Sequence, residues 1–409
     1  MNPSSENEIG PQRLAQANAA REAFLRALQS PDDSQRNVLL RALHTNASTE
    51  IGEKYNFASI TDALEFKRRT PIVRYNDMAS QIDACAKGAP AYFTSDQPIL
   101  FFESSGTTTG VSKQVPVTAT YFQQCYLPAY FASLGNLARF CPDAIRFDDR
   151  ALNLKFDPGA TRHRVQTGAE HVGISQVNFQ SMGHPLAVEP GTQAPWTDVD
   201  ATVENPHTRA YLRLRTAAVT DDLNLVIGIN PALVAALRFD VSAYANVWWK
   251  HSKRNRRRPS LSVFARRRTQ IDCVRWRRSM ASCCHNIFGP ESAMFSLGTV
   301  VRQSRMCRVS QTCLARTRLL AAPLGASESI VAVPIDTHPT SCALAINAAF
   351  FEFADAETPL DSTTDTLGFR DLVEGRRYHV ITTNIGGFYR YALGDVIQVD
   401  GSAGTACRV

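Results

Sequence analysis

Residues 251–320 break the regular pattern of this 409-residue chain more sharply than any other segment. They contain 15 arginines and Lys253 against only Asp272 and Glu291, so the segment has a local charge of +14. The whole chain carries +6, and the other residues together therefore carry −8. No hydrophobic period of 2 or 3.6 persists through the segment, which also holds half of the 10 cysteines. Any fold of this chain must accommodate a strongly basic stretch that lacks an amphipathic pattern.

Three explanations of this segment are open. A nucleic-acid-binding arm would use clustered arginines on phosphates and Trp276 on a base. A metal site would use Cys283, Cys284, His285, Cys307 and Cys313, but their spacing lacks the paired C-x-x-C pattern of tetrahedral zinc. Translation in a shifted reading frame of GC-rich DNA would yield Arg, Ser, Cys and Pro without pattern. We favour the third explanation, because basic arms usually lie at a terminus or between linkers.

The residues on either side of this segment have the periodicity of an α/β fold. The first 50 residues predict two helices, and Pro31 begins the second. One face of the first helix collects Leu14, Ala17, Ala20, Phe24 and Leu28. Residues 71–75 and 98–102 predict extended chain, the latter as a strand buried in a sheet. Residues 211–215 alternate like a strand, and Asn230-Pro231 predicts a strand-to-helix turn.

The length and the hydrophobic content of 44% are enough for a large core, with two or three domains. No apolar stretch approaches the roughly 20 residues that span a bilayer, and the start MNPSSENEIG lacks the order of a signal peptide. We therefore expect a soluble cytoplasmic protein that does not enter membranes and whose thiols stay reduced.

The strongest chemical motif, ESSGTTTGVSKQVP at residues 103–116, directly follows an apolar strand. Its small residues allow backbone N–H groups and hydroxyls to approach phosphate oxygens, and Lys113 adds a positive charge. It differs from a Walker P-loop, because Gln114 stands where Ser or Thr must hold the metal. Taken alone, the motif also fits a flexible surface loop.

Two further motifs are weak by themselves. Ser327 and Glu328 place a hydroxyl beside a carboxylate, a pair that suits an α-phosphate and Mg²⁺, although a surface turn has the same composition. The run YHVITTNIGGFYRYALGDVI at residues 378–397 predicts strand, glycine turn and strand. Its Asp395 is expected at a bend, where the carboxylate can accept both hydroxyls of a ribose.

The order of the three motifs resembles the adenylate-forming superfamily of acyl and aryl ligases and luciferases. The passages TPIVRYNDM, FFESSGTTTGVSKQVPVT, YLRLRTAA with IGINP, NAAFFEF and GGFYRYALGDVI are most similar to the auxin-responsive Gretchen Hagen family of acyl acid amido synthetases. The resemblance covers roughly residues 35–250 and 324–400. It implies a firefly-luciferase-like adenylation domain that activates a carboxylic acid with ATP and Mg²⁺ and couples it to an amino acid.

The resemblance also implies roles for individual residues. Lys113 and Glu328 are the expected catalytic residues, and Glu328 is the expected Mg²⁺ ligand. The expected ATP-binding residues are Ser104, Ser105, Gly106, Thr107, Thr108, Ser327 and Asp395.

Two departures from the family pattern bear on activity. Leu324 stands where the family usually has a Tyr that packs against adenine. The chain ends shortly after Asp395, whereas family members continue into a mobile C-terminal lid that supplies a lysine. We therefore expect a lid-less enzyme that turns over poorly or not at all.

The expected divisions of the chain are N-terminal helices at 1–60, the first part of the adenylation domain at 61–250, a poorly ordered segment at 251–320 and the last part of the adenylation domain at 321–409.

Two other functions remain open at this point. An acyl-CoA or aryl-CoA ligase would pass the acyl group to a thiol instead of an amine. An arginine-rich nucleic-acid-binding protein would require residues 251–320 to be in their true reading frame, and we consider it the less favoured partner class. The sequence names neither the acid nor the amino acid, and it leaves the oligomeric state undefined.

The reading-frame hypothesis makes a direct prediction. Resequencing the gene and translating the codons of residues 251–320 in all three frames will reveal a periodic, less basic sequence in one alternative frame. If neither alternative frame encodes such a sequence, the basic segment is genuine and the hypothesis is wrong.

Overall fold

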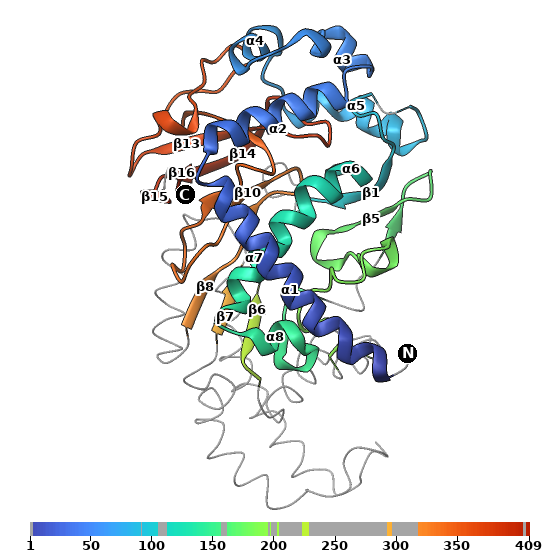
Figure 1. Ribbon diagram of the computed structural model, residues 1–409. Helices are drawn as coiled ribbons and strands as arrows, with labels where there is room; N and C mark the ends of the chain where they lie inside the picture. The colour runs from blue at the N-terminus through green and yellow to red at the C-terminus, as the bar shows by residue number, and fades with distance from the viewer. Residues whose placement is uncertain are drawn as a thin grey trace, which may run out of the picture.

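The computed structural model describes residues 3–90, 92–104, 113–156, 162–194, 197, 203, 223–228, 293–296, 318–403 and 406–409. The chain begins with two helices, α1 (Pro3–Ala27) and α2 (Pro31–Thr45), as predicted (Figure 1). The predicted apolar face of α1 is confirmed, because Ala17 and Phe24 are fully buried while Leu14 and Ala20 pack partly buried against the core. Pro31 occupies the first turn of α2, where its fixed φ suits the helix and its missing N–H costs nothing.

Helix α1 crosses the strongly apolar helix α7 (Leu127–Ala138) at very close range (Figure 1). A Cβ atom added to Gly135 of α7 would lie 2.2 Å from the carbonyl oxygen of Ala17. Only glycine therefore permits this approach of the two backbones. The contact joins the N-terminal helix to the interior of the molecule.

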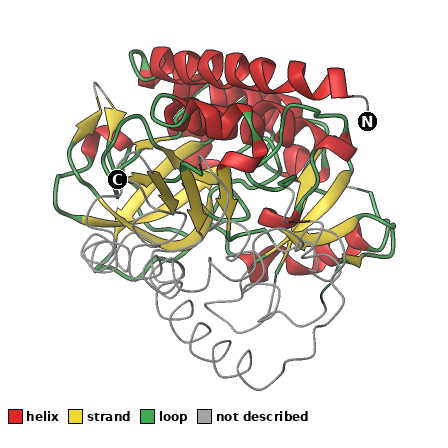
Figure 2. Ribbon diagram, turned by 90° about the horizontal axis from the view of Figure 1, so that it is seen from below, coloured by secondary structure: helices red, strands yellow, loops and turns green. Residues whose placement is uncertain are grey.

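The other helices are no longer than α7; several gather with α1, α2 and α7 on one side of the strands, and others lie beside the strands (Figure 2). They are α3 (Glu50–Lys54), η1 (Phe57–Ser59), α4 (Ala63–Arg69), α5 (Tyr75–Ala86), α6 (Ala119–Tyr121), the π-helix η2 (Phe122–Tyr126), α8 (Pro142–Arg146), η3 (Asp148–Arg150), η4 (Ile174–Gln176), η5 (Gln180–Met182) and η6 (Phe369–Asp371). The extended segment predicted at 71–75 reaches only to Arg74. Helix α5 starts at Tyr75 because Asp77 accepts a 2.8 Å hydrogen bond from the Arg74 N–H and thereby caps the new helix.

The strands form several small sheets instead of one large sheet. The order β2-β1-β5-β4 joins β2 (Gln114–Thr118), β1 (Pro98–Glu103), β5 (Glu170–Gly173) and β4 (His163–Arg164). A parallel sheet joins β3 (Ala151–Asn153), β6 (Leu225–Gly228), β7 (Ala293–Ser296) and β8 (Arg318–Ala321). Antiparallel sheets join β9 (Leu324–Gly325), β10 (Ile330–Val333) and β11 (Ala343–Leu344); β12 (Phe350–Asp355), β13 (Arg377–Thr383) and β14 (Tyr391–Gln398); and β15 (Ser402–Ala403) and β16 (Ala406–Cys407).

These elements confirm the predicted α/β class and several individual predictions. The run 98–102 lies in β1 with Leu100, Phe101 and Phe102 buried. The motif at 378–397 forms β13, a turn and β14. The predictions at 211–215 and 230–231 lie outside the described residues. Within 251–320 the structure describes 293–296 and 318–320, and their backbones pair as neighbouring parallel strands.

Two general features concern only the described ranges. No helix there combines the length and the apolarity that crossing a membrane requires. Within those ranges, the cysteines at positions 85, 125, 342 and 407 are free thiols.

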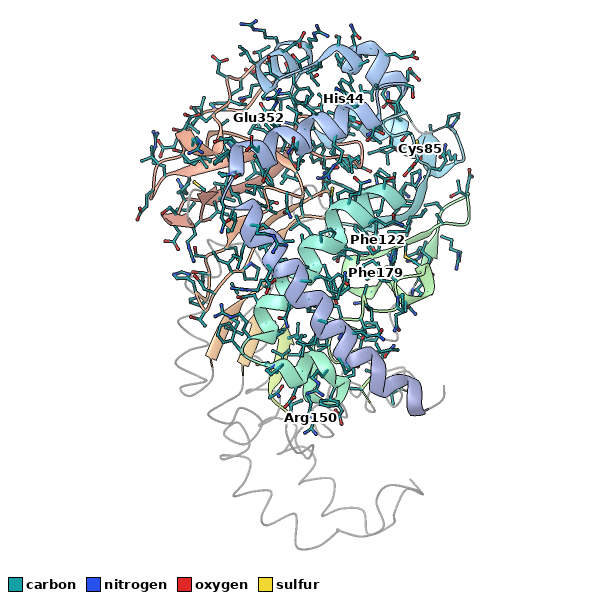
Figure 3. The ribbon with its side chains drawn as sticks, in the orientation of Figure 1. His44, Cys85, Phe122, Arg150, Phe179 and Glu352 are labelled. Carbon is teal, nitrogen blue, oxygen red and sulfur yellow. The ribbon has the colours of Figure 1, made fainter. Side chains whose placement is uncertain are left out.

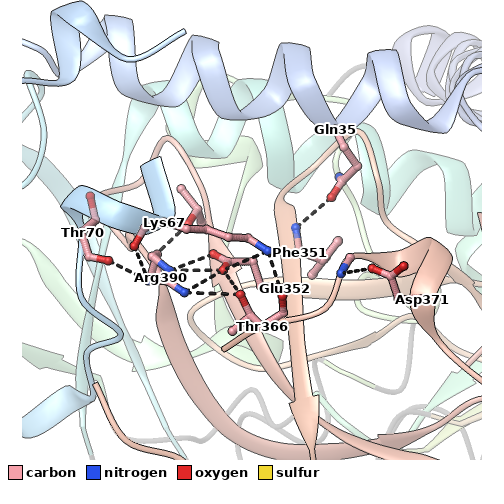
Figure 4. A network of polar contacts seen from close by, with 10 residues as sticks. Gln35, Lys67, Thr70, Phe351, Glu352, Thr366, Asp371 and Arg390 are labelled. Carbon is pink, nitrogen blue, oxygen red and sulfur yellow. Dashed lines mark hydrogen bonds and ion pairs between the residues drawn. The ribbon is translucent and has the colours of Figure 1, made fainter. Parts of the chain in front are cut away.

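A buried ion pair between Glu352 of β12 and Arg390, which directly precedes β14, holds the β12–β13–β14 sheet against α4 (Figure 4). The Arg390 Nη2 atom lies 2.9 Å from Glu352 Oε1, and Nε donates to both carboxylate oxygens at 3.1–3.2 Å. Arg390 Nη1 donates to the carbonyl oxygens of Lys67 and Thr70 at the end of α4. Thr366 completes the network by donating to Glu352 at 2.5 Å. Both charged side chains are therefore buried and well satisfied.

Removal of this carboxylate should be costly. Glu352→Ala leaves the Arg390 guanidinium buried without its counter-charge, so the free energy of unfolding should fall by about 3–5 kcal/mol in chemical denaturation. Asp355→Ala on the same strand is the matched control, because it removes only a partly exposed partner of the exposed Arg376 and should cost less than about 1 kcal/mol. Equal losses in the two variants would contradict a structural role for the buried pair.

Candidate functional site

The first motif is held at its base by the hairpin of β1 and β2. The Ser104 N–H donates to the Lys113 carbonyl oxygen at 3.2 Å, and the Lys113 N–H donates to Ser104 Oγ at 3.0 Å. These two hydrogen bonds close the loop and set the direction in which the Lys113 side chain leaves it. The structure therefore places Ser104 and Lys113 side by side.

The other predicted residues of this loop, Ser105, Gly106, Thr107 and Thr108, lie outside the described residues.

Lys113 meets the second motif across a gap of more than 200 residues in sequence. Its Nζ atom lies 3.4 Å from Glu328 Oε1, and the Glu328 side chain is only 4% exposed. The Tyr391 hydroxyl donates to the same oxygen at 2.7 Å and lies 3.4 Å from Lys113 Nζ. Each of the three sequence motifs thus contributes one side chain to a single polar cluster, which we call the Lys113–Glu328–Tyr391 triangle.

Ser327 and Glu328 lie in the tight connection between β9 and β10. The Ala326 N–H donates to the Ser329 carbonyl oxygen at 2.9 Å, which closes this turn. Ser327 is partly buried. The Asn384 side chain donates to the Glu328 carbonyl oxygen at 3.0 Å, so the turn is also tied to the segment between β13 and β14.

Tyr75 of α5 supports Lys113 from the side. The Lys113 ammonium lies 5.4 Å from the centre of the Tyr75 ring, within the range of a cation–π contact. The Tyr75 hydroxyl exchanges two hydrogen bonds with the backbone of Gln114, accepting at 3.0 Å and donating at 3.3 Å. Desolvation by burial raises the pKa of Tyr75, so the phenol stays neutral.

Asp395 lies inside β14 at a β-bulge and not at a chain bend. The register of β13 and β14 shifts between His379 and Ile381, and Gly394 has a φ of 84°, which a residue with a Cβ atom rarely adopts. The Asp395 side chain is exposed. Partial desolvation and then the negative charge of Glu328 raise its pKa, while Lys113 lowers it. Because the side chain is exposed, solvent screens these effects.

The carboxylate of Glu328 has the chemistry of a Mg²⁺ ligand. Magnesium accepts hard oxygen ligands and is usually held by one or two carboxylates together with substrate phosphates and water. Within the described ranges no group of three or more His, Cys, Asp or Glu side chains forms a complete metal cage. The phosphates of a bound nucleotide would therefore have to supply the other ligands of any magnesium at Glu328.

An aromatic cluster lies along the helices that follow β2. Phe122 of η2 stacks on Phe179 with their ring centres 4.6 Å apart, and His184 lies 4.9 Å from Phe122 (Figure 3). Tyr126 joins the cluster at 5.3 Å from Phe122. Tyr121 immediately precedes it and borders the turn after β13, since a Cβ atom added to Gly386 would lie 2.9 Å from the Tyr121 ring. This apolar group therefore lies next to the turn that carries Asn384.

Sequence reasoning missed three residues that build this site. Tyr391 and Asn384 lie inside the third motif. Nothing in the local sequence distinguishes Tyr391 from the neighbouring aromatic residues, or Asn384 from an ordinary turn asparagine, as a residue of the site. Tyr75 ends the passage TPIVRY and begins a helix. Leu324, the noted departure, lies in β9 and packs partly buried against the core.

Sequence models of one family match both sides of the site. The GH3 family N-terminal domain matches residues 20–242, and the GH3 family central domain matches residues 342–408. Neither match includes residues 243–341.

Two plant proteins are similar to this chain over most of its length. A probable indole-3-acetic acid-amido synthetase GH3.12 of Oryza sativa subsp. japonica is 22% identical over 427 residues, which cover 92% of this chain and 68% of the relative. The jasmonoyl--L-amino acid synthetase JAR4 of Nicotiana attenuata is 24% identical over 394 residues, covering 90% of this chain and 66% of the relative. The chain thus spans about two thirds of the length of these relatives.

Solved structures share the fold. The AtGH3.15 acyl acid amido synthetase in complex with 2,4-DB has a TM-score of 0.70 at 19% identity, with 96% of this chain and 69% of that chain covered. A 2-hydroxyisobutyryl-CoA ligase has a TM-score of 0.51 at 12% identity, with 95% and 65% covered. The fold is therefore that of adenylate-forming enzymes.

The raised pKa of Asp395 predicts the effect of neutralising it. Ionisation of Asp395 disfavours the folded state, so Asp395→Asn should raise Tm slightly at about pH 7. The gain should shrink as pH falls through the raised pKa towards the ordinary value of about 3.9, because wild-type Asp395 then becomes protonated. Thermal denaturation across this range, with Asp400→Asn as an exposed control, tests the sign. A lower Tm for Asp395→Asn at neutral pH would contradict it.

Proposed function

The chain belongs to the GH3 family, and on that basis we propose that it acts as an ATP-dependent acyl acid amido synthetase. The observation that carries the proposal is the Lys113–Glu328–Tyr391 triangle. A lysine beside a buried carboxylate, at the base of a Ser/Thr/Gly loop, suits a site that handles phosphate oxygens and their metal. Side chains from three motifs that are distant in sequence contact one another in this triangle. A loop with a purely structural role would not require these contacts.

In the proposed first step, a carboxylate oxygen of the acid forms a bond to the α-phosphorus of ATP. The bond between that phosphorus and the α–β bridging oxygen breaks, and pyrophosphate leaves with the electron pair. Lys113 supplies positive charge to the crowded phosphate oxygens, and the loop residues Ser104, Ser105, Gly106, Thr107 and Thr108 supply backbone N–H and hydroxyl donors. Asp395 accepts hydrogen bonds from the ribose hydroxyls, and Ser327 lies beside the α-phosphate.

Magnesium held by Glu328 would neutralise part of the phosphate charge.

In the proposed second step, the amine nitrogen of an amino acid bonds to the acyl carbon. The bond from that carbon to the phosphate oxygen of AMP breaks, AMP leaves, and the nitrogen loses a proton to give a neutral amide. A coenzyme A ligase of the same fold would use a thiol at this point. The acceptor therefore distinguishes the two reaction classes.

The acid is proposed to have an apolar body and to bind near the aromatic cluster of Phe122, Tyr126 and Phe179. The names of the similar proteins specify indole-3-acetic acid, a jasmonoyl group or an acyl acid, which supports a carboxylic acid with an apolar body. The three rings of the cluster are buried and stack on one another, so they would support the wall of such a site from behind. The π-helix η2 carries two of these rings, and π-helical turns are frequent at functional sites.

Turnover in this chain is proposed to be slow. The family matches leave out residues 243–341, and that range contains the whole of the basic segment 251–320. A foreign sequence there would replace part of the adenylation domain. Such a replacement removes buried contacts, and losses of a few kcal/mol are a large fraction of ordinary stability.

Pyrophosphate exchange tests the adenylation step. We expect incorporation of labelled pyrophosphate into ATP that depends on an added acid such as indole-3-acetic acid. Lys113→Met should lower the exchange rate by about 100-fold, the size typical of losing one electrostatic contact to a reacting centre. Lys87→Met is the matched control, because Lys87 is exposed at the end of α5 and, among the described residues, forms an ion pair with Asp83 and none with the candidate site.

The outcome also separates the acceptor classes. Amide formation when amino acids and coenzyme A compete would support the synthetase, and thioester formation would favour the ligase. Acid-independent exchange, or equal effects of Lys113→Met and Lys87→Met, would contradict the proposed site.

A further inference from the structure

Glu328 combines a position in a tight turn with a nearly complete burial of its side chain. It connects two short strands, β9 and β10, yet only 4% of the side chain is exposed. A carboxylate in such a place is held by its partners and not by a regular element. The partners of Glu328 therefore decide which way its two oxygens face.

Within the described residues, both side-chain contacts of Glu328 go to the same oxygen. Tyr391 donates to Oε1 at 2.7 Å, and Lys113 Nζ lies 3.4 Å from it. The tyrosine contact is a short hydrogen bond, whereas the lysine contact is at the long limit of one. Tyr391 is thus the stronger partner, and Oε2 is left for another ligand.

The tyrosine is itself rigidly placed. Its side chain is fully buried and packs edge-on against Phe388 with ring centres 4.9 Å apart. On either side, the Arg390 carbonyl oxygen accepts from the Val73 N–H at 3.1 Å, and the Ala392 N–H donates to the Val73 carbonyl oxygen at 2.9 Å. The hydroxyl position is therefore set by packing and by backbone pairing to a second segment.

The backbone of Glu328 is fixed from the same hairpin. Asn384 is fully buried and donates to the Glu328 carbonyl oxygen at 3.0 Å, while its own Oδ1 accepts from the Gly386 N–H at 2.9 Å. The β13–β14 hairpin thus holds both the main chain and the side chain of Glu328. A rigid support of this kind is typical of groups that orient a metal ligand.

We propose that Tyr391 is a positioning residue that turns Oε2 of Glu328 towards the magnesium of a bound nucleotide. The inference rests on the proposed function, because it needs a magnesium nucleotide at Glu328. A phenol suits the task, since it holds one oxygen of the carboxylate without neutralising its charge. Lys113 is then free to leave its long contact and bind phosphate, whereas Tyr391 keeps Glu328 in place.

The experiment compares Tyr391→Phe with Tyr389→Phe. Each variant removes one buried hydroxyl from the same segment, but the Tyr389 hydroxyl donates to the Phe93 carbonyl oxygen at 2.9 Å, outside the triangle. Binding of ATP is measured by equilibrium dialysis over a magnesium titration and again in excess EDTA, and Tm is recorded for each protein. No turnover is needed for these readouts.

We expect Tyr391→Phe to raise the magnesium concentration for half-maximal ATP binding by about 10-fold to 100-fold, the range found when a residue that supports a metal ligand is lost. Binding in EDTA should match that of the wild type. Tyr389→Phe should lower Tm to a similar extent as Tyr391→Phe but leave the magnesium titration unchanged.

Each other outcome has a definite meaning. If both variants titrate with magnesium like the wild type, or shift equally, Tyr391 has only a structural role and the inference is wrong, while the proposed function stands. If the wild type binds magnesium ATP but shows no acid-dependent exchange, the amido synthetase proposal fails. The comparison of Tyr391→Phe with Tyr389→Phe then still tests whether Tyr391 positions Glu328. If the wild type binds no ATP with or without magnesium, both proposals fail.

Discussion

The ion pair of Arg390 and Glu352 is the interaction on which the candidate site depends. It is buried, it joins β12 to the end of α4, and it holds Arg390 in a backbone conformation with φ of 46°, which is rare for a residue with a side chain. The Arg390 N–H donates to Thr383 Oγ1 at 2.9 Å, so the conformation is over-determined by its contacts. The next residue is Tyr391. The pair therefore sets where β14 begins and, with it, where the Tyr391 hydroxyl lies.

The β13–β14 hairpin, which this ion pair holds in place, contacts the motifs that contain Lys113 and Glu328. Its Asn384 and Tyr391 hold Glu328, and Glu328 and Tyr391 meet Lys113. The charges are arranged so that one buried carboxylate faces one lysine, with neutral phenols of Tyr75 and Tyr391 on either side. Asp395, farther along the same strand, is exposed and has a raised pKa. A site that binds a ligand commonly keeps such a group at some cost to stability.

The family matches include most of the elements that surround the candidate site. The matches cover 20–242 and 342–408, which include α1, α7, β1, β2 and the β12–β14 sheet. Glu328 lies in the unmatched range, close to its end, yet its contacts come from matched segments on both sides. The basic segment precedes it, and the described strands β7 and β8 pair in parallel with β6 and each other. Leu320 and Ala321 of β8 are buried in the hydrophobic core.

Much of the fold was readable from short-range patterns. The helical period of α1, the proline at the start of α2, the apolar run of β1 and the glycine turn between β13 and β14 all reflect local preferences of the backbone, which the sequence alone specifies. The motif order also identified Lys113, Glu328 and Asp395 as candidates. Tyr391, Asn384 and Tyr75 act through contacts with residues far away in sequence, and no local pattern encodes such contacts. Packing around the buried Arg390–Glu352 pair decides them, because a hydroxyl or an amide becomes a specific partner only when burial removes water as the alternative.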